Sequence, residues 1–106
     1  MKLFIDSRDN LKTIIKIDGE SFVIRYNSPR DQDVLGSVKR ALDEKKLKWE
    51  AIDEIGVATG KGSFTGIRVG MAVGQALGFV LGIKVNSQEV LEQGEVDYGA
   101  EPNIIL

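Results

Sequence analysis

The chain has 106 residues, of which 42% are apolar and 28% are charged, so it is large enough for one domain with its own core. Its net charge of −2 and pI near 5.1 exclude the strongly basic surface that is typical of nucleic-acid-binding domains. The chain has neither cysteine nor histidine, which removes disulfides, thiolate nucleophiles and the commonest general base and metal ligand. We therefore expect no catalytic, cofactor-binding or metal-binding residues.

Three short strands are predicted in the first quarter of the chain. Residues 2–7 form a largely apolar run with Asp6 near its end, where the carboxylate is either a site candidate or an anchor for the next turn. Residues 11–17 and 21–27 are rich in β-branched and aromatic residues, and Asp18-Gly19-Glu20 between them is a hairpin signal. The simplest arrangement is an antiparallel meander.

A helix is predicted from Pro29 to about Lys46, because Ser28-Pro29 matches the preferred residues at a helix start. Its apolar positions recur with helical spacing, at Val34, Leu35, Val38, Ala41 and Leu42. A connection over 48–54 follows, in which we expect Trp49 to cover the edge of the core. Residues 55–59 then form a fourth short strand.

The next segment has glycine at every fourth position, at Gly66, Gly70, Gly74, Gly78 and Gly82. A glycine inside a helix costs about 0.8–1 kcal/mol relative to alanine, so this helix needs support from packing. Gly82 is predicted to end it, and Ser63 or Thr65 to cap its start. Because it is apolar around most of its circumference, we expect it to be buried from several sides, with its glycine stripe open to a close-packed partner.

A fifth strand is predicted over 83–86, a short helix over 87–92, and a polar tail with a possible edge segment at 104–106. The resulting fold class is α/β, a mixed sheet in the order β-β-β-α-β-α-β with helices packed on it. Strands four and five each follow a helix, so they should be parallel crossovers.

The loop from Gly60 to Gly66 joins a strand to a helix N-terminus, as phosphate loops do. Its spacing does not match Walker A, because only three residues separate Gly56 from Gly60 and Lys61 is followed by glycine. It does not match the dinucleotide fingerprint either, because Gly60-Lys61-Gly62 is followed by one residue too many before Gly66. Ser63 has no histidine or cysteine to activate it as a nucleophile. A tight turn that aims the following helix is the favoured interpretation, and an anion contact by Lys61 is the alternative.

The run Gly62-Ser63-Phe64-Thr65-Gly66-Ile67-Arg68-Val69-Gly70 resembles the GSFTGxRxG signature of the TsaB (YeaZ) family, the partner subunits in bacterial tRNA threonylcarbamoyladenosine (t6A) synthesis. Leu3-Phe4-Ile5-Asp6-Ser7 is similar to that family's opening strand. The resemblance covers residues 1–92 and implies an RNase H-like domain of the actin and sugar-kinase superfamily. Lys61 stands where family members usually have proline. The family's opening strand usually has threonine and then serine after the aspartate, whereas here Asp6 is followed by Ser7 and Arg8.

Family members are about twice as long, so residues 93–106 are expected to be a tail or edge segment, with the second family domain absent. The resemblance implies a non-catalytic subunit that binds the catalytic subunit TsaD or a second copy of itself through its helices, and contacts tRNA only within the complex. A cytoplasmic location is expected from the N-terminus and the short apolar stretch described below. The signature loop comprises Gly60, Lys61, Gly62, Ser63, Phe64 and Thr65. The expected partner interface comprises Gly66, Arg68, Gly70, Ala72, Val73, Gly74, Gln75, Leu77, Gly78, Leu35, Val38 and Leu42.

Two other functions stay open. One is a nucleotide-binding module that uses Asp6 and the 60–66 loop, and the other is a self-assembling structural domain. The N-terminus turns polar too soon for a signal peptide, and the apolar stretch 69–83 is shorter than the roughly 20 residues of a membrane span and contains Gln75. Glycines at spacing four also occur in transmembrane dimers, but we expect no membrane contact.

Overall fold

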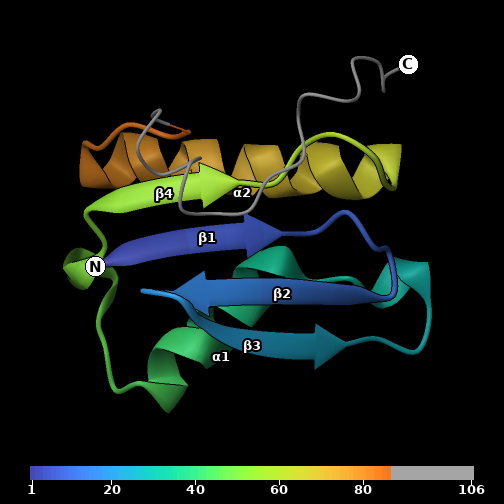
Figure 1. The fold of residues 1–106 in the computed structure, drawn as a ribbon, viewed down its shortest axis with the longest axis horizontal. Helices are drawn as coiled ribbons and strands as arrows, with labels where there is room; N and C mark the ends of the chain where they lie inside the picture. The colour runs from blue at the N-terminus through green and yellow to red at the C-terminus, as the bar shows by residue number, and fades with distance from the viewer. Residues whose placement is uncertain (87–106) are drawn as a thin grey trace.

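The structure is a computed structural model that describes residues 1–86. Its strands are β1 (Lys2–Asp6), β2 (Lys12–Ile17), β3 (Glu20–Arg25) and β4 (Glu54–Val57). Its helices are α1 (Val34–Glu44) and α2 (Phe64–Leu81), with the single 3₁₀ turns η1 (Pro29–Asp31) and η2 (Trp49–Ala51). The mixed α/β architecture expected from the sequence is confirmed over these residues (Figure 1).

The four strands form one sheet in the order β3-β2-β1-β4. β1 pairs antiparallel with β2 and parallel with β4, and β2 pairs antiparallel with β3. Asp18 and Gly19 both have positive φ, 49° and 91°, which is the geometry of a two-residue hairpin whose twist matches that of its strands. The predicted meander and the parallel crossover to the fourth strand are therefore confirmed.

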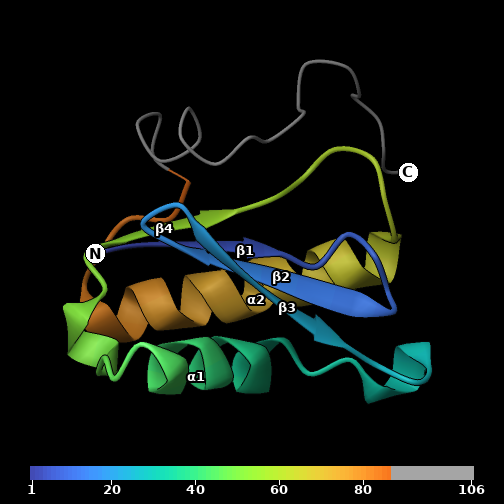
Figure 2. The same cartoon turned by 60° about the horizontal axis from the view of Figure 1, so that its bottom comes forward.

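Both helices lie on one face of the sheet, where they pack beside each other (Figure 2). The core between the layers is built from alternate strand residues such as Leu3, Ile5 and Ile15, together with Val38 and Leu42 of α1, each at most 2% exposed. Trp49 packs against this core, as expected. Phe4 points to the opposite face, where it forms a small separate cluster with Ala58.

The start of the first helix differs from the prediction. Pro29–Asp31 forms only a 3₁₀ turn, and the Ser28 side chain caps no backbone group. Gln32 is extended, with ψ of 125°, and α1 begins at Val34 with Asp33 as its N-cap. The Asp33 carboxylate accepts a hydrogen bond from Gly36 N at 2.9 Å, so the stronger capping residue sets the helix start five residues later than Pro29.

The fifth strand is reduced to a single parallel bridge between Ile55 and Val85. Asn86 continues this contact, because its N–H donates to Ile55 O at 2.8 Å and its side-chain Oδ1 accepts from Val57 N at 2.6 Å. The helix predicted over 87–92, the tail 93–106 and the edge segment 104–106 lie outside the described residues.

Candidate functional site

The signature loop connects the carboxyl end of β4 to the N-terminus of α2. Gly60 and Gly62 have φ of 94° and 146°, a backbone region that side chains disfavour. Ser63 caps α2 by accepting a hydrogen bond from Gly66 N at 3.1 Å, which confirms one of the two predicted caps. At the other end, Gly82 has φ of 71° and ends the helix as predicted.

The residues just after β1 hold this loop in place. The Ser63 N–H donates to the Arg8 carbonyl at 2.6 Å, and a Cβ on Gly62 would lie 2.5 Å from Arg8 Cβ. The buried Ser7 hydroxyl donates to the Gly66 carbonyl at 2.7 Å. The signature loop is thus packed directly on the backbone of residues 7–8, and only glycine fits at Gly62.

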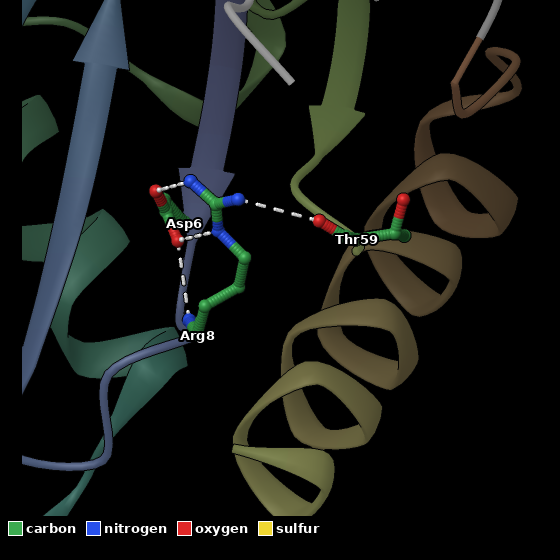
Figure 3. Close-up of polar contacts among 3 residues, drawn as sticks. All are labelled: Asp6, Arg8 and Thr59. Carbon is green, nitrogen blue, oxygen red and sulfur yellow. Dashed lines mark hydrogen bonds and ion pairs between the residues drawn. The ribbon is translucent and has the colours of Figure 1, made fainter. Parts of the chain in front are cut away.

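Asp6 and Arg8 form a close ion pair beside this loop (Figure 3). Arg8 Nε donates to one carboxylate oxygen at 3.0 Å and Nη2 to the other at 2.9 Å, while Nη1 reaches the Thr59 carbonyl at 3.4 Å. The Asp6 carboxylate also accepts from the Arg8 backbone N–H at 3.1 Å, so it anchors the first turn. The pair therefore links the carboxyl ends of β1 and β4.

The electrostatics of Asp6 follow from this pairing. Burial by itself raises the pKa of the carboxyl, but the hydrogen bonds and the positive charge of Arg8, helped by the charge of Lys16, outweigh it. The pKa of Asp6 therefore lies below its usual value, and the group is ionised at neutral pH. A carboxylate engaged in this way is a structural anchor and a poor general base.

A cavity of about 570 Å³ opens next to the pair. It is bordered by Asp6 and Arg8 on one side and by Lys12, Lys61 and Ser63 on others. Within residues 1–86 no group of three or more acidic, histidine or cysteine residues is placed to hold a metal ion. Of the predicted loop residues, the structure brings Lys61, Gly62 and Ser63 to this cavity, together with Asp6.

The orientation of α2 corrects the sequence-based expectation. Its buried residues are Gly66, Gly70, Gly74 and Gly78, and they face the sheet of the same chain. A Cβ on Gly66 would overlap the Ser7 carbonyl, and one on Gly74 would lie 2.5 Å from Val57 Cγ2. The glycine stripe lets β1 and β4 approach the helix backbone, so it is not an open surface.

The other expected interface residues divide into three groups. Val38 and Leu42 are core residues of α1, and Val73 and Leu77 are half-buried against the core, so these four do not form an open surface. Arg68, Ala72 and Gln75 are exposed on α2, and Leu35 is 49% exposed on α1. That these exposed positions contact a partner stays a prediction.

The large apolar residues of α2 instead point outward. Phe79 is 88% exposed, Val80 77% and Val69 38%, and the exposed Ala72 and Ala76 lie between them at helical spacing. At the N-terminal end Phe64 is 53% exposed, with the Arg68 guanidinium 5.2 Å from its ring centre. We call Val69, Ala72, Ala76, Phe79 and Val80 the outer stripe of α2. It was missed because helical periodicity identifies stripes but not which of them faces the sheet.

By length and composition, α2 is the one helix of residues 1–86 that could cross a membrane, with a mean hydropathy of 1.4 over 18 residues. The sequence-based exclusion of a membrane span counted only residues 69–83 as apolar helix. The helix is longer, so its length does not exclude a span. Packed helices of soluble proteins pass the same test, and here the four glycines are accounted for by contact with β1 and β4.

Comparison with known proteins now identifies the family. The model of the family described as "TsaD: tRNA N6-adenosine threonylcarbamoyltransferase" matches residues 31–103, more than half of the chain. The chain belongs to this family. The TsaD family match includes β4, the signature loop and α2, but not the Asp6–Arg8 pair, which precedes residue 31.

Two solved structures related to YeaZ support the resemblance drawn from the signature. YeaZ from Pseudomonas aeruginosa matches with a TM-score of 0.63 and 29% identity, over 79% of this chain and 42% of that chain. An uncharacterised protein with similarity to peptidase YeaZ from Pseudomonas aeruginosa matches with a TM-score of 0.64 and 30% identity, over 79% and 40%. The resemblance to YeaZ is confirmed, and this chain spans less than half the length of these relatives. No curated protein sequence matches it significantly.

Proposed function

We propose that this chain is a non-catalytic, cytoplasmic partner subunit in tRNA t6A synthesis, which binds a TsaD-like catalytic subunit through the outer stripe of α2. The observation that carries the proposal is the exposure of Phe79 and Val80 at one end of an apolar helical stripe. A contiguous apolar surface of this kind is typical of protein interfaces. The family match and the likeness to YeaZ support the catalytic subunit as the partner.

The neighbouring helix would extend the interface. α1 lies beside α2 on the same face of the sheet (Figure 2), and its Leu35 is 49% exposed. An aromatic anchor flanked by smaller apolar residues is the usual composition of the energetic centre of an interface. Phe79 is therefore the residue whose loss should weaken binding most, and tRNA would be contacted only within the complex.

The test is a titration of the purified catalytic subunit with the chain and with a Phe79→Glu variant. We expect the variant to weaken binding at least about thirtyfold, because a charge would replace the most exposed apolar side chain of the contact. Leu11→Glu is the matched control, because Leu11 is 46% exposed but lies outside both helices, and its affinity should not change. Equal affinities of the chain and the Phe79 variant, or no binding by either, would contradict the proposal.

A second candidate function is a nucleotide-binding module. It is favoured by the 570 Å³ cavity, where Lys12 and Lys61 could contact phosphates. It is weakened by the engagement of both Asp6 carboxylate oxygens by Arg8. Calorimetry with magnesium and ATP separates the two, because the partner proposal predicts no measurable heat of binding by the chain alone.

A further inference from the structure

The sheet has a free edge at β3, far in the strand order from β4. Within residues 1–86, β3 pairs only with β2. The register is uninterrupted, from Lys12 opposite Arg25 to Ile17 opposite Glu20. The Tyr26 N–H donates to Leu11 O at 2.8 Å. In the alternating antiparallel pattern, the backbone N–H and C=O groups of Ile24, Phe22 and Glu20 are therefore directed toward β2. The backbone N–H and C=O groups of Ser21, Val23 and Arg25 are consequently directed outward.

This edge lacks the features that usually prevent strands from pairing with one another. β3 has six residues without proline, without lysine and without a bulge, and its central Val23 is 48% exposed. Natural proteins commonly protect such an edge with a charge, a proline, a bulge or a covering loop. Here the charges Glu20 and Arg25 stand only at the two ends of the strand.

We propose that β3 is an interface between two copies of this chain, in which the two β3 strands pair antiparallel about a two-fold axis at Val23. In that register Val23 lies opposite Val23 of the second copy, and Arg25 lies opposite Ser21. The outward N–H and C=O groups of all three residues then face one another, and no two like charges are directly opposed. Each copy uses its one β3 edge, so the assembly closes as a dimer.

The charges of α1 support a second copy as the occupant. Hollows of about 340 and 420 Å³ separate β3 from α1, and Arg40 borders both of them. The larger hollow is lined by Phe22 of β3 and by Glu44. The smaller hollow is lined by Arg25 of β3. A two-fold axis at Val23 reverses this order, which brings Arg40 of each copy level with Glu44 of the other. Asp43 is engaged by Lys39 at 3.0 Å, so Glu44 is the carboxylate for Arg40.

Charge exchange tests this arrangement. Arg40→Glu and Glu44→Arg each place two like-charge pairs in their own dimer, so each alone should raise the dimer dissociation constant about tenfold. An equimolar mixture of the two variants restores both opposite-charge pairs and should dimerise as well as the unchanged chain. Sedimentation equilibrium measures all three, with circular dichroism to confirm that each variant is folded.

Two further variants separate this interface from association through α2. Val23→Pro removes an outward N–H without removing a β2–β3 hydrogen bond, and it should leave the chain monomeric. Phe79→Glu should leave the β3 dimer unchanged, although it is expected to weaken binding of the catalytic subunit. A chain that is monomeric at millimolar concentration, a dimer that survives Val23→Pro, or a variant mixture that stays as weak as its components would overturn the proposal.

Discussion

The two helices cover the same face of one sheet, but they pack on it in opposite ways. α1 buries large side chains, Val38 and Leu42 among them, and directs charged residues such as Lys39 and Arg40 to solvent. α2 buries four glycines and directs Phe79 and Val80 outward. The difference shows that the distance between helix and sheet, and not apolarity alone, decides which face is buried.

The close approach of α2 has an identifiable cause. Ser7 and Val57 occupy the space where side chains of Gly66, Gly70 and Gly74 would lie, so larger residues cannot face the sheet there. The apolar residues of α2 are consequently displaced to the far side of the helix. α1 lies against β2 with no such constraint and follows the usual amphipathic rule.

The largest effect on stability is expected in α1. Leu42→Ala should lower the free energy of unfolding by about 3 kcal/mol, because Leu42 is only 2% exposed and its removal leaves a cavity. Leu35→Ala on the same helix is the matched control, and should change it by less than about 0.5 kcal/mol because Leu35 is half exposed. Urea unfolding measures both, and equal losses would show that the assigned core face of α1 is wrong.

In α2 the preference between glycine and alanine should reverse from one face to the other. Gly66→Ala should lower the free energy of unfolding by about 2 kcal/mol, because the new Cβ overlaps the Ser7 backbone carbonyl. This overlap outweighs the gain in helix propensity. Ala72→Gly, on the exposed face, should also cost about 1 kcal/mol, from propensity alone. Thermal unfolding checks both, and a stabilising Gly66→Ala would contradict the close packing of α2.

The smallest effect concerns the turn that anchors the start of α2. Arg8→Gln removes the partner of Asp6 and should cost about 1 kcal/mol at pH 7, since the pair is partly exposed. The pKa of Asp6 is lowered in the folded protein, so the stabilisation is present above the ordinary value of 3.8 and is lost as the pH falls through the lower folded value.

The pH dependence distinguishes this ion pair from a packing effect. The unfolding free energies of the unchanged chain and of Arg8→Gln should converge as the pH falls through the folded-state pKa of Asp6, which lies below 3.8. Arg8→Lys is the control: it keeps the charge but not the two-pronged contact, so we expect it to retain part of the difference. A difference that stays constant from pH 7 until Asp6 is protonated would show that Arg8 acts through packing alone.

Much of the fold could be predicted from local sequence signals. The hairpin at Asp18-Gly19, the Ser63 and Gly82 caps and the signature loop were each specified by a few neighbouring residues. The start of α1 could not be placed, because Ser28-Pro29 and Asp33 both match a helix start and only Asp33 caps the α-helix. Asp6 was identified, but its partner Arg8 was not assigned a role.

The sequence by itself determined that residues 64–81 form a glycine-striped apolar helix, because periodicity and capping are local properties. Only the tertiary structure decided which stripe faces the sheet. That choice depends on Ser7, which is distant from the helix in the chain, and on Val57 of the preceding strand, and both occupy the space next to the glycines. Steric exclusion of side chains between the sheet and α2 depends on contacts that local periodicity does not show. Because of it, the proposed docking surface of α2 consists of Phe79 and its apolar neighbours and not of the glycines.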